Sequence, residues 1–522
     1  MSSRPSRGVA ALRVVLGEDK QGPVVAGAIV IAAVALLALT VFTSDRLKTV
    51  GPLLALAVLF AVLHQSILRW RSLLVMIVLI ILFIPIRRYS LAASLPIHLE
   101  PYRLIVFFVG AAWITSLLID PRVRFRKTPL DGPLLLFMFI ALASDIVNRA
   151  RVNSVPGEVP KKLLFFLSYL IVFYFTVSVI RRFSDVESVT RVLVVGGAIL
   201  GFLGLVERNT GYDVFNHLQS VFPFLHLDAS QIPHLHRGGR LRVYASSQHP
   251  IALGAALAML VPFGIYLTRR RGGKLWWVAV VLMTFGSLST GSRTSIIMFA
   301  ALALVYLLGR PGKVLRLWPL LIPALLAIHL AVPGSLGTIR SSFFPKGGII
   351  AQQTNASVGS GRLATLGPAL HREFVPNPIL GEGFGTRVTV PDPPSVPTTN
   401  GPILDDQWLG TLLETGLAGA LTLLWLFLRF MRRLWPESQD DESPRSWYLL
   451  AAVASVVCFG VSMFFYDAFS FIQVTFMLFI VLGLGVAAFL APEPVRVAVR
   501  VPRQTIRVPL VPRLDDPQGQ PG

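Results

Sequence analysis

The chain has 522 residues and a mean hydropathy of +0.66; 54% of its residues are hydrophobic and only 14% are charged. Soluble domains carry about 25% charged residues, so the composition excludes an ordinary water-soluble protein and indicates a membrane protein. The formal net charge of +21 is spread over short segments between apolar runs, which argues against a nucleic-acid-binding surface.

Apolar runs recur along the chain, each about as long as a helix that crosses a bilayer. They predict an all-α polytopic integral membrane protein with about 14 (12–14) transmembrane helices. The second and third runs are short, which leaves open a hairpin in place of two crossings. No small-residue cleavage motif follows the first run, so it is not a cleaved signal peptide. The predicted spans are residues 23–43, 50–66, 72–86, 103–119, 131–147, 163–180, 187–206, 248–267, 274–290, 294–309, 316–333, 406–428, 446–463 and 469–491.

Arginine and lysine residues predict the orientation, because cytoplasmic loops carry an excess of both. With residues 1–22 in the cytoplasm, the membrane domain 23–491 is followed by a cytoplasmic tail, 492–522, that is predicted to be disordered. The basic residues then expected inside include Arg122, Arg124, Arg126, Lys127, Arg181, Arg182, Arg269 to Arg271, Lys274, Arg310, Lys313, Arg316, Arg429, Arg432 and Arg433. The first half fits less well, because six cations are expected outside: Arg87, Arg88, Arg149, Arg151, Lys161 and Lys162.

This topology leaves two long outer loops, about 207–247 and 334–405, and long loops in a compact protein are usually functional or disordered. In the second loop, residues 360–370 read as a short amphipathic helix, residues 378–386 as a tight glycine-rich turn, and the proline-rich residues 391–397 as a flexible segment.

Arg293 lies in a short polar stretch between two apolar runs. A charge at the centre of a membrane helix costs on the order of 2.5 to 3.5 kcal/mol, and less near the surface. Such an arginine is a candidate for binding an anion such as a phosphate. The alternative is a helix end whose arginine snorkels to the lipid headgroups.

Four local motifs follow one another between about residues 200 and 430. They are Gly239-Arg240-Leu241-Arg242 with Ser246-Ser247-Gln248-His249-Pro250; Leu288-Ser289-Thr290-Gly291-Ser292-Arg293; Gly361-Arg362 with Pro378-Ile379-Leu380-Gly381-Glu382-Gly383-Phe384-Gly385; and Asp405-Asp406-Gln407-Trp408-Leu409 with Leu413-Glu414-Thr415-Gly416-Leu417-Ala418-Gly419. Their order, spacing and position around the outer loops resemble the O-antigen ligase and polymerase family of bacterial envelope glycan enzymes.

The resemblance implies a multi-pass glycosyltransferase of the bacterial cytoplasmic membrane with an outward-facing active site. Such enzymes take a glycan from an undecaprenyl-pyrophosphate carrier and transfer it to a sugar hydroxyl. The partners implied are this lipid-linked donor, a glycan acceptor and the bilayer. Because the leaving group is already a pyrophosphate, no cofactor is expected, and the protein supplies positioning, charge stabilisation and a base.

The family's basic catalytic residues map onto Arg293 and Arg242, with Arg240 competing for the second role and Arg362 as a further substrate-binding residue. Guanidinium groups bind phosphate oxygens in bidentate fashion and stay charged. The alternative is that these arginines anchor the outer loops to lipid headgroups.

In one respect the chain departs from the family. Where the ligases have a histidine followed by asparagine, this sequence has Asp405 and Asp406. Either aspartate is a candidate for orienting or deprotonating the acceptor hydroxyl, or for capping a helix. The departure favours repeat-unit polymerisation over ligation to a lipid or other envelope acceptor. His371 is a weaker replacement for the missing histidine, and His249 and Gly383 are further substrate-binding candidates.

No metal site is predicted, because His234 and His236 match no recognised metal-binding spacing and the chain has a single cysteine, Cys458. A competing class is a transporter or flippase of lipid-linked sugars. Transporters often show internal repeats with discontinuous helices in both halves. No repeat is evident here, and the informative residues gather in the outer loops.

Overall fold

The computed structural model describes residues 69–91, 100–120, 123–228, 236–237, 240–316, 366–367, 369–387, 405–440 and 443–492. Several predicted features lie outside the described residues. They are the spans 23–43 and 50–66, the span 316–333 after its first residue, the proline-rich segment 391–397, and the residues Arg362 and His234. The described helices belong to one compact unit, which ends at Ala491.

The fold is helical, and every predicted span that falls within the described residues is a helix. Only helices and closed barrels satisfy backbone polar groups in lipid. The helices are α4 (Trp70–Phe83), α5 (Pro101–Ile119), α6 (Asp131–Val147), α7 (Arg149–Ser154), α8 (Glu158–Val179), α9 (Phe183–Thr210), α10 (Pro250–Arg271), α11 (Lys274–Ser289), α12 (Arg293–Gly309), α13 (Pro311–Leu315), α18 (Gln407–Leu434), α19 (Pro444–Ser462) and α20 (Ile472–Leu490).

Short elements lie in the connections. They are the short 3-10 helices η1 (Val214–Ser220), η5 (Pro436–Ser438) and η6 (Ala468–Ser470), the short π-helix η4 (Leu370–Phe374), and the strands β1 (Tyr89–Leu91), β2 (Leu225–Leu227), β3 (His236–Arg237) and β4 (Arg240–Leu241). Strand β1 pairs antiparallel with β2, and β3 pairs antiparallel with β4. Of the predicted amphipathic helix 360–370 only the last residues are described, and they lead into η4.

Seven of the described helices are long and apolar enough to cross a membrane, and α4, α11 and α12 are shorter apolar helices. The chain is therefore an all-α membrane protein, whereas the total of about fourteen spans stays a prediction. Helices α10 and α20 form the centre, since nearly all of their residues are buried against neighbouring helices.

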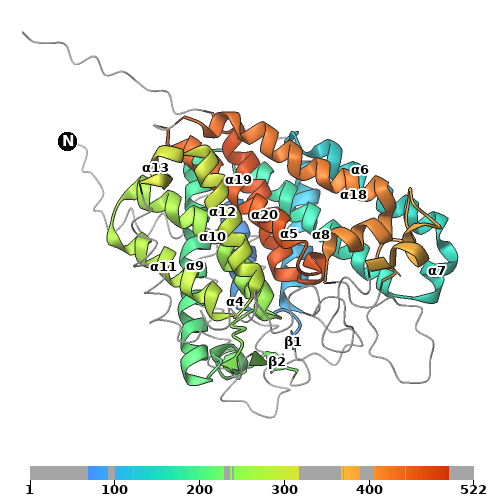
Figure 1. Ribbon diagram of the computed structural model, residues 1–522, viewed down its shortest axis with the longest axis horizontal. Helices are drawn as coiled ribbons and strands as arrows, with labels where there is room; N and C mark the ends of the chain where they lie inside the picture. The colour runs from blue at the N-terminus through green and yellow to red at the C-terminus, as the bar shows by residue number, and fades with distance from the viewer. Residues whose placement is uncertain are drawn as a thin grey trace, which may run out of the picture. The chain divides into compact units, whose positions relative to one another are not determined.

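Successive helices alternate in direction, so the connections gather at two ends of the unit (Figure 1). One end, here the β1–β2 end, holds the connections that follow α4, α9, α11 and α19. The other, the α13 end, holds the connections that follow α10, α12 and α18. Arg310 ties two of these together there, since its Nη2 donates to the carbonyls of Ser438 and Asp440 at 2.7 and 2.8 Å.

The described basic residues expected in the cytoplasm belong to helix ends and connections at the α13 end, and the six exceptional cations belong to helix ends and connections at the β1–β2 end. We therefore expect the β1–β2 end to face outward. Cysteine introduced at residue 355 should react with a membrane-impermeant maleimide added from outside, and cysteine at Gly272 should react only after permeabilisation. The native Cys458 is buried and gives little background. The reverse pattern would place the site described below in the cytoplasm.

Close helix contacts fix the β1–β2 end. Gly286 of α11 lies against Gly201 of α9, and a Cβ added to Gly286 would be 2.5 Å from the Gly201 Cα atom. Two helices approach this closely only where neither has a side chain. The contact holds the last turn of α9 beside the last turn of α11, and polar residues follow in both helices.

Helix α18 is broken at Gly416, which has φ +66° and ψ −167°. The break frees backbone groups on both sides, and the segment that contains the glycine-rich turn satisfies them. The amides of Glu382 and Gly383 donate to the carbonyls of Leu413 and Glu414 at 2.9 and 3.1 Å, and the amide of Leu417 donates to the Pro378 carbonyl at 2.9 Å. Residues 378–383 thus supply the hydrogen bonds that the backbone of α18 loses at its break.

Candidate active site

The first part of the site is a set of arginines around the turn between α11 and α12. Gly291 gives this turn its positive φ of 63°. Arg208, at the end of α9, donates through Nη1 to the Ser289 carbonyl at 2.7 Å. Arg242 donates through Nε to the Thr290 carbonyl at 3.3 Å, and Arg293 is the first residue of α12. We call Arg208, Arg242 and Arg293 the arginine cluster.

The segment that carries Arg242 is held firmly. The buried carboxylate of Glu207 accepts hydrogen bonds from the amides of Tyr244 and Ala245 at 3.0 and 2.8 Å. Arg88, which is 1% exposed, donates to the Ala245 carbonyl at 2.6 Å and pairs with Asp213 at 2.7 Å. Ala245 itself has a positive φ of 44°. A loop fixed from several sides keeps the Arg242 side chain in place.

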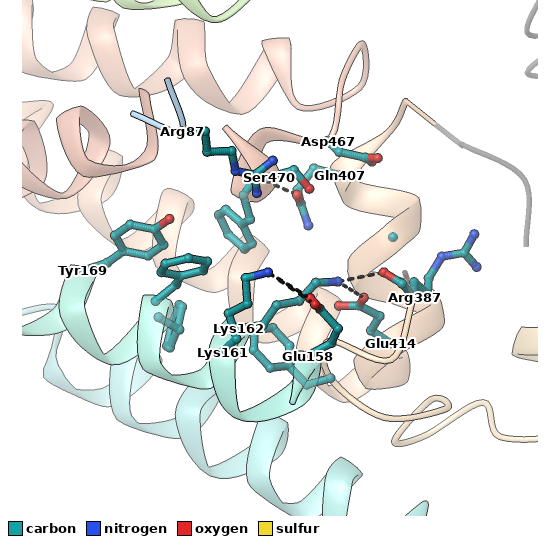
Figure 2. A pocket seen from close by; sticks show the side chains of 15 residues that line it. Arg87, Glu158, Lys161, Lys162, Tyr169, Arg387, Gln407, Glu414, Asp467 and Ser470 are labelled. Atoms are coloured by element: carbon teal, nitrogen blue, oxygen red, sulfur yellow. Dashed lines mark hydrogen bonds and ion pairs between the residues drawn. The ribbon is translucent and has the colours of Figure 1, made fainter. Parts of the chain in front are cut away.

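The second part of the site is a cavity of about 120 Å³, here the α8–α18 pocket (Figure 2). It forms where the first turns of α8 and α18, the α19–α20 connection and residues 384–387 meet. Lys162 donates through Nζ to the Arg387 carbonyl at 2.8 Å and contacts the Glu414 carboxylate at 3.3 Å. Lys161 pairs with Glu158 at 3.3 Å.

Across the pocket from these lysines in Figure 2 lie Gln407 and Asp467. Gln407 accepts a hydrogen bond from the Phe469 amide at 2.8 Å. Burial and the carboxylates of Asp405 and Glu414 raise the pKa of the Asp467 carboxyl to about 6, although Arg387 and Lys162 act to lower it. A carboxyl with this pKa is able to take up a proton near neutral pH.

The arginine cluster and the pocket are joined by the α19–α20 connection. Gln248 donates through Nε2 to the carbonyl of Ser470, which lines the pocket, at 2.9 Å. The rings of His249 and Phe471 lie 5.4 Å apart. The segment that follows Arg242 therefore contacts the connection that carries Asp467.

The two aspartates that replace the ligase motif have different surroundings. Asp406 is the N-cap of α18, and its carboxylate accepts a hydrogen bond from the Leu409 amide at 3.1 Å. Asp405 has a positive φ of 48°, which is unusual for a residue other than glycine, and it interacts electrostatically with Asp467. Capping thus accounts for Asp406, whereas Asp405 acts electrostatically on Asp467, which lines the pocket.

The remaining predicted residues have mainly local roles or lie apart. His249 caps α10, because its Nδ1 accepts from the Ile251 amide at 3.1 Å. Gly383, with φ +113°, belongs to the turn that closes the break in α18. His371 is exposed on η4 and does not line the pocket. Arg240 is described only as backbone of β4.

Several site residues were not predicted from the sequence. Arg208 ends an apolar helix much as Arg293 begins one, and Asp467 is a lone acid in the short interruption between the last two spans. An arginine at the end of an apolar helix and a single acid between two spans are both common in membrane proteins, so neither marks a site by itself. Arg87 and Lys162 appeared only as exceptions to the orientation rule, and the structure places both in the pocket lining.

These features define a polytopic helical membrane protein with a polar site at one end of its helices. Residues 278–424, from α11 to the middle of α18, match the family model of the O-antigen ligases. This match supports the resemblance to the O-antigen ligase and polymerase family that the motifs predicted, and it covers Arg293, the glycine-rich turn and Glu414. No curated protein matches the chain.

Proposed function

We propose that the protein transfers a glycan from an undecaprenyl-pyrophosphate-linked donor to a sugar hydroxyl, without a metal, at the outer face of the bacterial cytoplasmic membrane. The observation that carries the proposal is the position of three arginines at one turn, in a segment that is hydrogen-bonded to the connection carrying the pocket residue Asp467. The test is transfer by the purified protein in lipid nanodiscs, given the lipid-linked repeat unit.

The arginine cluster is proposed to bind the donor diphosphate. Its members come from three elements, α9, the β4–α10 connection and α12, and meet at the turn between α11 and α12. Fixed guanidinium groups stabilise the negative charge that grows on a departing diphosphate.

The acceptor hydroxyl is proposed to enter from the pocket side. Its oxygen bonds to the anomeric carbon of the donor sugar, while the bond from that carbon to the phosphate oxygen breaks. The diphosphate leaves with the bonding electrons, and the hydroxyl proton passes to the carboxylate of Asp467, while Asp405 orients the hydroxyl. General-base catalysis of this kind contributes about 10²- to 10⁴-fold.

Asparagine variants separate the two neighbouring aspartates. We expect Asp405→Asn to lower turnover by about 10²-fold or more, because the carboxylate that orients the acceptor hydroxyl beside the base is lost. Asp406→Asn should be nearly silent, since asparagine caps a helix as well as aspartate, and Asp406→Ala should cost about 1 kcal/mol of stability. The test compares the transfer rates of the two asparagine variants at matched expression. Equally small effects at both positions would mean that the two aspartates only cap the helix.

The pH dependence follows from Asp467. Its carboxyl accepts a proton only when ionised, and its pKa is raised to about 6. We expect transfer to be constant above pH 7 and to fall as the pH decreases through 6. Asp467→Asn should be slow and should lose this acid limb. A wild-type profile that is flat from pH 5 to 8 would rule out Asp467 as the base.

We propose polymerisation rather than ligation as the physiological reaction. The support is the aspartate at the position where ligases have histidine. Loss of the gene product should leave single repeat units on the carrier where long chains were. Full-length chains stranded on the carrier would instead indicate a ligase, with the same donor chemistry and a different acceptor.

A further inference from the structure

We infer that the α8–α18 pocket holds a neutral sugar ring of the acceptor glycan. This inference rests on the proposed function, and it adds the place and the chemical class of the acceptor. The arginine cluster is the proposed site of the diphosphate. The pocket differs from the cluster in three ways: it has an aromatic wall, a balanced charged rim and a small volume.

Aromatic side chains form one wall of the pocket. Phe166 and Phe384 are buried, and their rings meet edge to face with centroids 6.2 Å apart. Tyr169 is stacked on Phe479 at 5.4 Å, which fixes its ring. Rigid aromatic faces pack well against the C–H groups on the apolar face of a sugar ring. A diphosphate gains nothing from such a wall.

The charged rim is balanced. Lys161 is paired with Glu158, Lys162 contacts Glu414, and Arg387 is paired with Glu373. Arg87 and Asp467 also lie in the lining, so that four cations offset four carboxylates and the rim attracts neither an anion nor a cation strongly. It offers alternating donors and acceptors, and a sugar hydroxyl both donates and accepts hydrogen bonds. The rim therefore favours an uncharged, hydroxyl-rich ligand.

The size and position fit one ring of a longer chain. The cavity of about 120 Å³ is smaller than the roughly 300 to 1,000 Å³ of pockets for drug-sized ligands. Asp467 lies in its lining, so a bound ring has a hydroxyl beside the proposed base. The rest of an acceptor chain would leave through the open side of the pocket.

Gly410 offers a clean way to fill the pocket. It lines the cavity from within α18, and a Cβ added there would meet nothing closer than the Gln407 side chain at 4.0 Å. Leucine is also a better helix former than glycine. Gly410→Leu should thus occupy the pocket without weakening the fold. Gly312→Leu is the matched control, because Gly312 lies in a helix at the α13 end and also faces open space.

Binding is measured by saturation-transfer NMR on the protein in nanodiscs, with a panel of neutral methyl hexosides and with methyl glucuronide. We expect at least one neutral hexoside to bind to the wild type, to Gly312→Leu and to Arg293→Ala, and not to Gly410→Leu. In the transfer assay, Gly410→Leu should raise the KM for the acceptor by about tenfold or more and leave the KM for the donor unchanged.

Three results would overturn the inference: no neutral hexoside binds, Gly410→Leu binds it as well as the wild type, or inorganic pyrophosphate or the glucuronide displaces it. The proposed function fails separately. Normal transfer by Arg293→Ala would refute the diphosphate site whatever the hexosides do, and loss of transfer in that variant with unchanged hexoside binding by Gly410→Leu would refute only the sugar pocket.

Discussion

Arg293→Ala is expected to lower the rate of glycan transfer by about 10²- to 10³-fold, because a positioned donor to the departing charge is lost in the transition state. Arg293→Lys should recover part of the rate, since lysine keeps the charge but not the bidentate geometry. The measurement is initial transfer rate in nanodiscs at equal protein amount, with thermal unfolding to show that the variants are folded.

The matched control is Arg271→Ala, which removes an exposed arginine at the α13 end. It should transfer normally. Arg242→Ala should also be strongly impaired, and Arg208→Ala less so. If Arg293→Ala and Arg271→Ala transferred equally well, the cluster would be no more than a headgroup anchor.

Gly416→Ala is expected to destabilise the protein by about 3 kcal/mol or more. Its φ of +66° is unfavourable for alanine, and the added Cβ would lie 2.2 Å from the Ile379 carbonyl oxygen. Either the helix or the glycine-rich turn must move, which exposes the groups that hydrogen-bond across the break. Yield, monodispersity after detergent extraction and thermal unfolding report the loss.

Gly410→Ala provides the comparison within the same helix. Gly410 has ordinary helical geometry and open space around it, so alanine there should be neutral or mildly stabilising. A Gly416→Ala protein as stable as Gly410→Ala would mean that the break in α18 is not needed for the fold.

The helices could be predicted from the sequence because their signal is local. Runs such as 131–147 and 274–290 are apolar along their whole length, and α6 and α11 match them within a residue. The positive φ values at Gly381, Gly383 and Gly385 also follow from a local pattern of alternating glycines. The family resemblance could also be found in the sequence, because it rests on short motifs and on their order along the chain.

The pairing of distant residues could not be predicted. Lys162 and Glu414 lie 252 positions apart, and no periodicity connects them. Glu414 lies within an apolar run of the sequence, and its ion pair with Lys162 appears only in the structure. The break in α18 was equally hidden, because Gly416 lies within an apolar run, and only the contact with residues 378–383 explains why the helix opens there.

Lys162 reaches the membrane long before its acidic partner Glu414 is synthesised. In the proposed orientation, the early spans must carry this cation, and Arg151 with it, to the translocated side, against the usual bias that retains positive charge in the cytoplasm. Glu382 and Glu414 neutralise these two cations only after the second half has been inserted. The early hairpins are therefore expected to be metastable during translation. Their membrane orientation becomes stable only when the late spans have been inserted.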